Sequence, residues 1–387
     1  MSHLLVTNDF PPKVGGIQTY LWELWRRLPA GEVTVLTSPH PGSAAFDAAA
    51  PMPVVRTREP VLLPLPGMAG RIRRLAAEHG ASLVVLDPAL PLGAVGPRLG
   101  LPYAVVVHGA EVAVPGRLPI ARPLLGRVLR GARGVVAAGG YPAAEARHAL
   151  AFGRRCSGLP AACGPEVVVI PPGVDLDRFR PLDEPGRRSV RTRLGLPETG
   201  LLVVSTSRLV PRKGMDVLVE SLTRLVVHRP DLTLAIAGAG RDLARLRTLA
   251  GRLGVTRHVR FLGRVPDADL ADLCAAADVY AMACRNRWGG LEQEGFGIVF
   301  LEAAAAGVAQ VAGRSGGSAD AVVDGDTGLV VDRPDDPAVV AAALGTLLDD
   351  PERRATMGVA ARQRAEDNFG WDWLATQLGD ALRSWSG

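Results

Sequence analysis

Lysine is nearly absent from this sequence of 387 residues, although the chain carries 44 Lys+Arg. Its two lysines are Lys13 and Lys213. Because arginine fills almost every other cationic position, a lysine at 213 indicates a place where a compact ammonium is needed and a planar guanidinium does not serve. The stretch around it, "SRLVPRKGMDVL" at 207–218, is therefore the first candidate site.

Cysteine and long apolar runs are also scarce, and each shortage excludes a class of protein. The cysteines form no CxxC or Cys/His metal spacing, so we expect reduced thiols in a cytosolic protein. They lie at Cys156, Cys163, Cys274 and Cys284. No apolar run is long enough to span a membrane, and the opening "MSHLLVTNDFPP" lacks the pattern of a signal peptide.

Charge is mixed throughout the chain, which excludes a further class. The net charge is +5 and the pI is about 9.4, without a basic block or an aromatic-interleaved basic stripe. This balance argues against nucleic-acid binding and favours an anionic small molecule or an anionic membrane surface. A hydrophobic content of 48% excludes a disordered chain.

Short β-branched runs alternate with helical patterns along the chain. This alternation predicts an α/β fold with parallel sheets wrapped by helices. Two series of runs predict two sheets; the first is 3–7, 33–37, 82–87, 103–109, 134–139 and 166–173, and the second is 201–209, 232–240, 259–265, 278–283, 309–313 and 328–332.

The sequence predicts two tandem Rossmann-like, doubly wound domains. We expect an N-terminal domain at 1–170 and a C-terminal domain at 189–365. The polar, proline-rich passage 171–188 is the predicted linker. A helix with an aromatic face, 366–387, is expected to pack back toward the N-terminal domain. Ligand-binding loops should lie at the carboxyl ends of the strands, with a cleft between the domains.

Two features of the first half are candidates for a site. Gly15 and Gly16 follow the first strand and precede a helix, where amides can approach an anion, although a tight turn without a ligand is the alternative. His108 ends a strand, where its imidazole can donate to a substrate hydroxyl or move a proton. The alternative for His108 is a buried structural histidine.

Two features of the second half are more specific. Arg208 and Lys213 share one strand-to-helix loop, which suits a diphosphate, although a solvated basic loop is the alternative. Glu294 and Glu302 bracket a glycine-flanked turn that opens a helix, with Glu302 about two turns inside it. These carboxylates would bind the uncharged hydroxyl-bearing ends of a ligand whose middle the cations hold. Two unrelated surface acids are the alternative.

Together these motifs resemble the retaining GT-B glycosyltransferases of family 4 over nearly the whole chain. The ordered set is the glycine loop, "VHG", "PPGVD", "SRLVPRKG", "GAG", "FLGRV" and the E-x7-E pair. The stretches "VTNDFPPKVGGIQTY", "RNRWGGLEQEGFGIVFLEA" and "AGRSGGSADAV" are similar to the GDP-mannose-dependent phosphatidylinositol mannosyltransferases of the PimB type, which act on phosphatidylinositol monomannoside.

The resemblance implies that the domain at 1–170 serves the acceptor and the membrane and that the domain at 189–365 binds the nucleotide sugar. It also implies a role for each residue of the donor site. Arg208 and Lys213 would hold the donor diphosphate, and Glu302 would hold the ribose. Glu294 would contact the donor sugar, helped by backbone groups of Gly295, Phe296, Gly297 and Ile298.

The resemblance also implies the rest of the reaction. Gly16 would lie in the loop that closes over the phosphates, His108 would be the catalytic histidine near the sugar, and Val265 would seat the base. No metal or other cofactor is implied, because no Asp-x-Asp lies near the diphosphate loop. The reaction would be front-face transfer with retention, although a covalent intermediate is not excluded.

The helix expected at 121–133 bears on the membrane. An apolar stripe runs along it, and opposite the stripe lie Arg122, Arg127, Arg130 and Arg133. The helix either meets anionic lipid, which would place the protein at the inner face of the cell membrane, or packs on its own sheet with a solvated basic face.

Three hypotheses compete. The first is transfer of mannose from GDP-mannose to a phosphatidylinositol mannoside. The second is a family-4 transferase that uses a UDP- or ADP-linked donor or a soluble acceptor. The third is a protein of another class, such as a sugar-nucleotide epimerase or a non-catalytic nucleotide-binding module.

Overall fold

The computed structural model describes residues 2–157 and 164–387, and the side chains of these residues except 153–157. The chain divides into two compact units. The first contains the residues up to Pro172 together with Trp371–Gly387, and the second is Gly173–Gly370. Cys274 and Cys284 are free and buried. The expectation for Cys156 and Cys163 lies outside the described side chains.

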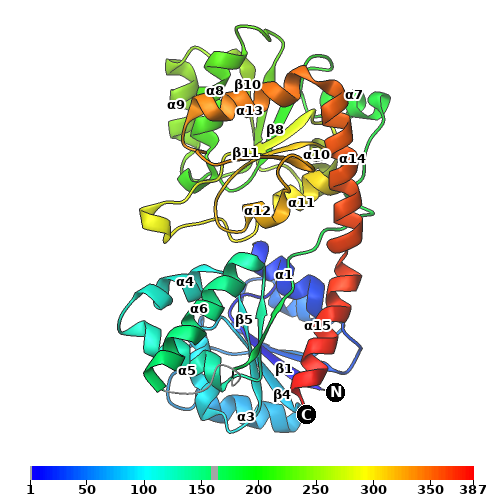
Figure 1. Ribbon diagram of the computed structural model, residues 1–387. Coiled ribbons are helices and arrows are strands. Elements are labelled where there is room, and N and C mark those ends of the chain that lie inside the picture. Colours follow the sequence, from blue (N-terminus) through cyan, green and yellow to red (C-terminus); the bar gives the residue numbers. More distant parts are fainter. Residues whose placement is uncertain (1, 158–163) are drawn as a thin grey trace. The chain divides into compact units, whose positions relative to one another are not determined.

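The first unit is a sheet of seven parallel strands in the order β3-β2-β1-β4-β5-β6-β7, with helices on both faces (Figure 1). Near-continuous apolar runs form these strands because both faces of the sheet are covered. The strands are β1 His3–Thr7, β2 Val33–Thr37, β3 Val54–Arg56, β4 Leu83–Asp87, β5 Tyr103–Val107, β6 Gly134–Ala137 and β7 Glu166–Val169. The helices are α1 Gly16–Trp25, α2 Ser43–Ala49, α3 Met68–Glu78, the 3-10 helix η1 Leu92–Arg98, α4 Ala110–Arg117, α5 Ala121–Gly131, α6 Gly140–Ser157 and α15 Trp371–Trp385.

The second unit repeats this plan with six parallel strands in the order β10-β9-β8-β11-β12-β13. The strands are β8 Leu202–Thr206, β9 Thr233–Ala237, β10 Val259–Gly263, β11 Val279–Met282, β12 Gln310–Gly313 and β13 Gly328–Val331. The helices are α7 Glu184–Arg193, α8 Met215–Leu225, α9 Leu243–Arg252, α10 Asp267–Ala275, α11 Ile298–Ala305, α12 Ser318–Ala321, α13 Pro337–Asp349 and α14 Pro351–Asn368, with 3-10 helices η2 Pro211–Lys213, η3 Thr256–His258 and η4 Trp288–Gly290. Every predicted run contains a strand, and the short edge strand β3 is an additional one.

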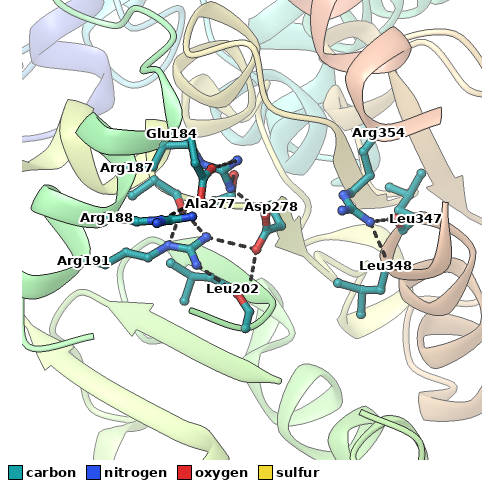
Figure 2. A network of polar contacts seen from close by, with 12 residues as sticks. Glu184, Arg187, Arg188, Arg191, Leu202, Ala277, Asp278, Leu347, Leu348 and Arg354 are labelled. Atoms are coloured by element: carbon teal, nitrogen blue, oxygen red, sulfur yellow. Dashed lines mark hydrogen bonds and ion pairs between the residues drawn. The ribbon is translucent and has the colours of Figure 1, made fainter. Parts of the chain in front are cut away.

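The predicted linker 171–188 requires a correction, because α7 begins inside it at Glu184. Figure 2 shows what holds this arginine-rich helix to the second unit. Arg187 and Arg191 contact the two carboxylate oxygens of Asp278 at 2.6 and 3.0 Å, and the backbone N–H of Leu202 donates to the same carboxylate at 2.7 Å. An acid that precedes β11 thus fixes a helix far away in the sequence.

The C-terminal helix begins at Trp371 and not at 366, because α14 extends to Asn368. Within the first unit α15 packs against α1, and the Trp385 indole N–H donates to Glu166 at 3.0 Å. Trp371 and Trp385 are buried, as the aromatic face predicts, whereas Trp373 is 49% exposed. Trp373 therefore does not belong to the packed face.

Candidate functional site

Lys213 lies at the carboxyl edge of the second sheet, in the turn that joins β8 to α8. It ends η2 and is only 7% exposed, which excludes a solvated loop at this position. Gly214 follows with a φ of 71°, and a Cβ there would lie 1.8 Å from the carbonyl oxygen of Ala283. A glycine is required because the turn passes directly against the chain that leaves β11.

Glu294 is fixed from the opposite side by the segment that follows β12. Its backbone N–H donates to the Ser315 hydroxyl at 3.1 Å, and its carbonyl accepts from the N–H of Gly317 at 3.0 Å. A Cβ at Gly316 would lie 2.0 Å from the Glu294 carbonyl oxygen. The sequence "GRSGGS" thus serves to hold the backbone of Glu294, and its glycines allow this close approach.

The side chains of Lys213 and Glu294 meet. The Lys213 ammonium lies 2.7 Å from Glu294 Oε2, and Arg212 Nη1 lies 3.0 Å from the same oxygen. Burial by itself would raise the pKa of the Glu294 carboxyl, but Lys213, Arg212 and Arg208 hold that pKa below its ordinary value. Glu294 is 6% exposed, so it is not a surface acid. Cations and a carboxylate that were expected to hold different parts of a ligand thus form one ion-paired cluster in this structure.

Arg212 is a member of this cluster that the sequence reasoning missed. Besides Glu294 it contacts the backbone carbonyl of Gln293 at 3.3 Å and approaches Glu292 Oε1 at 3.8 Å. Its position between Pro211 and Lys213 could have indicated this role, because the side chains of so short a turn cannot all point into solvent. Arg208, in contrast, is exposed at the end of β8.

The turn before α11 is built as the glycine spacing predicts. Gly297 adopts a φ of 88°, and α11 begins at Ile298, so Gly295–Ile298 forms the N-terminal end of the helix. Phe296 is buried. Val265 is half-buried just after β10, at the same edge of the sheet.

Glu302 is the fifth residue of α11, about one turn into the helix and not two. Among the described residues its Oε2 atom has no hydrogen-bond partner, although that atom is buried. Burial raises the pKa of the Glu302 carboxyl to about 7; Arg178 opposes this rise and Asp267 adds to it. A buried oxygen that accepts no hydrogen bond can bind a hydroxyl donor.

In the first unit, His108 directly follows β5 and faces Asp87 at the end of β4. The His108 Nε2 lies 2.8 Å from Asp87 Oδ1, and the Thr7 hydroxyl donates to Asp87 Oδ2 at 2.6 Å. The Tyr20 ring packs edge-on against the imidazole at 5.3 Å. The ends of β1, β4 and β5 thus bring Thr7, Asp87 and His108 together through the Asp87 carboxylate.

Acidic groups surround this imidazole. The Glu111 carboxylate accepts from the backbone N–H groups of His108 and Gly109. Burial by itself would lower the pKa of His108, but Asp87, Glu111 and Asp9 raise that pKa above its ordinary value. Asp87 is a second residue that the sequence reasoning missed, although an acid at a strand end was a visible signal.

Gly16 is the first residue of α1 and is exposed, so the glycine loop leads directly into a helix as expected. Lys13, in the same loop, pairs with Asp9 at 2.7 Å, and the Gln18 amide donates to the same Asp9 oxygen at 2.6 Å.

The helix α5 departs in part from the predicted stripe. Leu125, Val128 and Leu129 are buried, but Leu124 is 42% exposed. Of the four arginines, Arg127 and Arg133 are exposed. Arg122 and Arg130 are half-buried, and the Arg122 guanidinium lies 3.1 Å from the centre of the Phe152 ring.

No helix in the described part of the chain is both long and apolar enough to cross a membrane. Within the same residues, no group of three or more His, Cys, Asp or Glu side chains is arranged to hold a metal ion.

Solved structures identify the class of fold. The Anabaena protein Alr3699/HepE, crystallised with UDP, superposes with a TM-score of 0.82 at 22% identity, over 99% of this chain and 100% of that one. Sucrose-phosphate synthase from Thermosynechococcus elongatus gives a TM-score of 0.76 at 22% identity, over 99% of each chain. The two Rossmann-like units thus have the GT-B fold.

Sequence comparison identifies the family. Residues 14–178 match the model of "Glycosyltransferase Family 4", and residues 186–364 match that of "Glycosyl transferases group 1". A GDP-mannose-dependent alpha-(1-6)-phosphatidylinositol monomannoside mannosyltransferase of Mycolicibacterium smegmatis is 44% identical, over 98% of this chain and 97% of the relative. A relative in Corynebacterium glutamicum, named for the monoacylated acceptor, is 35% identical over 98% and 97%. This chain belongs to the same family of glycosyltransferases.

Proposed function

We propose that this protein transfers mannose from GDP-mannose to a phosphatidylinositol mannoside at a membrane surface. The observation that carries the proposal is the buried cluster of Lys213, Arg212 and Glu294 at the carboxyl edge of the second sheet. It joins a compact cation, which suits a phosphate, to a carboxylate that precedes the N-terminus of a helix and suits sugar hydroxyls. The printed activities of relatives that match nearly the full chain support the choice of mannose and acceptor.

Each part of the donor has a matching group along this edge. The diphosphate meets Lys213 and Arg208, and the sugar meets Glu294 and the turn Gly295–Ile298. Lys213 is already paired with Glu294, so the incoming phosphate competes with a carboxylate for this ammonium. The ribose hydroxyls donate to Glu302, whose buried Oε2 has no partner among the described residues. The base lies against the backbone near Val265.

We propose that transfer proceeds with retention on the front face of the sugar. The C–O bond to the diphosphate breaks, and Lys213, Arg208 and the amides of the turn before α11 stabilise the charge that develops on the leaving oxygen. The acceptor hydroxyl attacks from the same face and gives its proton to that oxygen. His108, oriented by Asp87, donates a hydrogen bond to a sugar hydroxyl. Because cationic side chains supply the positive charge, we expect turnover to persist in the presence of a chelator.

We further propose that the protein visits an anionic membrane surface at the inner face of the cell membrane. The exposed Arg127 and Leu124 of α5, and the exposed Arg133 just after that helix, support this contact. Arg122 and Arg130 contribute less, since their side chains are half-buried and less available to lipid head groups.

A calorimetric screen of nucleotide sugars tests the donor, followed by transfer assays on phosphatidylinositol monomannoside in vesicles. We expect GDP-mannose to bind more tightly than UDP-glucose or ADP-glucose and to yield a mannosylated lipid. Tight binding of a UDP-linked sugar, or transfer to a soluble acceptor alone, would favour the second hypothesis. Binding without any turnover would identify a nucleotide-binding module.

A further inference from the structure

The segment between β11 and α11 forms a short hairpin, Arg287–Glu292, near whose tip lies an exposed tryptophan. Arg287 and Glu292 exchange backbone hydrogen bonds of 2.9 and 3.2 Å, and their side chains pair at 2.9 Å. Trp288 is 65% exposed. In Figure 1 this hairpin is the yellow loop that projects from the second unit.

The backbone holds Trp288 in an uncommon conformation. Its φ of 50° is the one positive value among the non-glycine residues that the structure describes. Such a conformation is unfavourable for a bulky residue. Gly289 and Gly290 follow with φ values of 62° and 82°, which a side chain would disfavour. The chain therefore accepts local strain while the indole stays exposed to solvent.

The indole is supported by a cation. The Arg287 guanidinium carbon lies 4.8 Å from the centre of the Trp288 ring, within the range of a cation–π contact. Because Arg287 is itself held by Glu292, the ring is kept in place and most of its surface remains free for another partner.

A chain of contacts fastens the hairpin to the donor site. Glu292 approaches Arg212 at 3.8 Å, and Arg212 pairs with Glu294 at 3.0 Å. The Gln293 amide donates to the carbonyl of Gly290 at 2.7 Å. The exposed indole is thus positioned by the same groups that surround the expected sugar-binding carboxylate.

The order of strands indicates which part of a ligand lies near the hairpin. In the sheet β10 is three positions from β11, which corresponds to about 14 Å. The base is expected beside β10, and the diphosphate at the end of β8, the immediate neighbour of β11. The hairpin therefore lies at the carbohydrate end of the ligand and far from the base.

We propose that Trp288 is a specificity-determining residue that stacks on the apolar C–H face of the acceptor's sugar ring. The inference rests on the proposed function. The donor sugar is assigned to Glu294 and the turn that follows it, so the ring beyond it belongs to the acceptor. An exposed indole offers a large, rigid and amphipathic surface for such a ring.

The test compares Trp288→Ala, Trp288→Phe and a matched control, Trp373→Ala, which removes an exposed tryptophan from α15. We expect Trp288→Ala to raise the KM for phosphatidylinositol monomannoside about tenfold. Trp288→Phe should restore part of this loss, and Trp373→Ala should behave as the wild type. The Kd for GDP-mannose should not change in any variant. Tryptophan emission should change when the deacylated acceptor is added to the wild type, and this change should be absent in Trp288→Phe.

Three results would overturn the inference. They are an unchanged acceptor KM in Trp288→Ala, a weakened Kd for GDP-mannose, or a loss of vesicle binding that accounts for the higher KM. In each case the wild type would still transfer mannose. Failure of the proposed function is different, because the wild type itself would then give no mannosylated lipid.

Discussion

The two sheets present their carboxyl edges with opposite charge. In the first unit one imidazole, His108, lies among the acids Asp87, Glu111 and Asp9. In the second unit one carboxylate, Glu294, lies among the cations Lys213, Arg212 and Arg208. The backbone plan is the same in both, since parallel strands bring loop residues together at one edge. In the proposed function the residues placed there, and not the fold, separate a site for proton and hydroxyl chemistry from a site for an anion.

The largest effect should come from Lys213→Arg, which keeps the charge but changes its shape. The buried space at 213 suits an ammonium, and a guanidinium would push against Glu294 and the close turn at Gly214. We expect turnover to fall by at least about a hundredfold and the affinity for GDP to weaken. Calorimetry with GDP and a transfer assay measure the two effects.

The matched control is Lys13→Arg, the same exchange at the exposed lysine, with thermal unfolding to confirm that both variants fold. Lys13→Arg should keep nearly wild-type turnover. If Lys213→Arg and Lys13→Arg had equal effects, the loop that carries Lys213 would not differ from an ordinary exposed basic loop.

The next effect tests the acidic edge. Asp87→Asn keeps the hydrogen bond to His108 but removes the negative charge that raises the His108 pKa. The imidazolium should then lose its proton at a lower pH. We expect kcat/KM to fall about tenfold at pH 8, and its basic limb to move to lower pH. A pH–rate profile measures this shift.

Thr7→Val is the control, since it removes the other hydrogen bond to Asp87 without a change of charge. It should leave the basic limb near its wild-type position. If the basic limb of the pH–rate profile of Asp87→Asn stayed at its wild-type pH, the charge of His108 would not matter for turnover.

The two glutamates of the second edge should respond differently. Glu302→Gln should weaken both GDP and GDP-mannose about tenfold, because each carries the ribose. Glu294→Gln should reduce turnover but spare the affinity for free GDP, since it removes the carboxylate that competes with phosphate for Lys213. Calorimetry with GDP alone separates the two. Equal weakening of GDP in both variants would contradict this division.

Glu302 also predicts a pH dependence of stability. Its pKa in the folded protein is about 7, above the ordinary value of 4.5, so the protonated form favours folding. This contribution is complete below about pH 4.5 and is lost as the pH rises through 7. Glu302→Gln should therefore be more stable than the wild type at pH 8, by on the order of 2 kcal/mol, and nearly equal to it at pH 4.5. Urea unfolding at the two pH values measures the difference.

The last effect concerns the membrane. Charge reversal of the exposed pair, Arg127→Glu with Arg133→Glu, should weaken co-sedimentation with anionic vesicles about tenfold or more, since each arginine contributes about 1 kcal/mol near the surface. High salt should have the same effect on the wild type. Arg224→Glu with Arg252→Glu, an exposed pair in the second unit, is the control. Unchanged sedimentation of the α5 variant would exclude this helix as the contact.

Most strands were predictable because they are continuous apolar runs, and those in the middle of each sheet are buried on both faces. The edge strand β3 was missed, since its three residues are only half-buried and do not stand out from the loops around them. The helix α7 was missed for a different reason. Its arginine-rich sequence favours a linker, and its stability depends on Asp278, which lies about 90 residues away in the chain.

The site was predictable as a set of positions but not as a set of contacts. Arg208, Lys213, Glu294 and Glu302 stood out because residue type and loop position coincide. Arg212 and Asp87 did not, because their importance comes from partners that lie far away in the sequence. The pairing of Lys213 with Glu294 likewise required the close approach that Gly214 and Gly316 permit.

Analysis of the transfer product tests the central claim most directly. The wild type is incubated with GDP-mannose and phosphatidylinositol monomannoside in anionic vesicles, and the lipid product is examined by mass spectrometry and proton NMR, with Lys213→Arg in parallel. We predict that the wild type adds one mannose in the α configuration and that Lys213→Arg adds almost none. A wild type that adds no mannose under these conditions, or a Lys213→Arg variant that adds it at the same rate, would contradict the account.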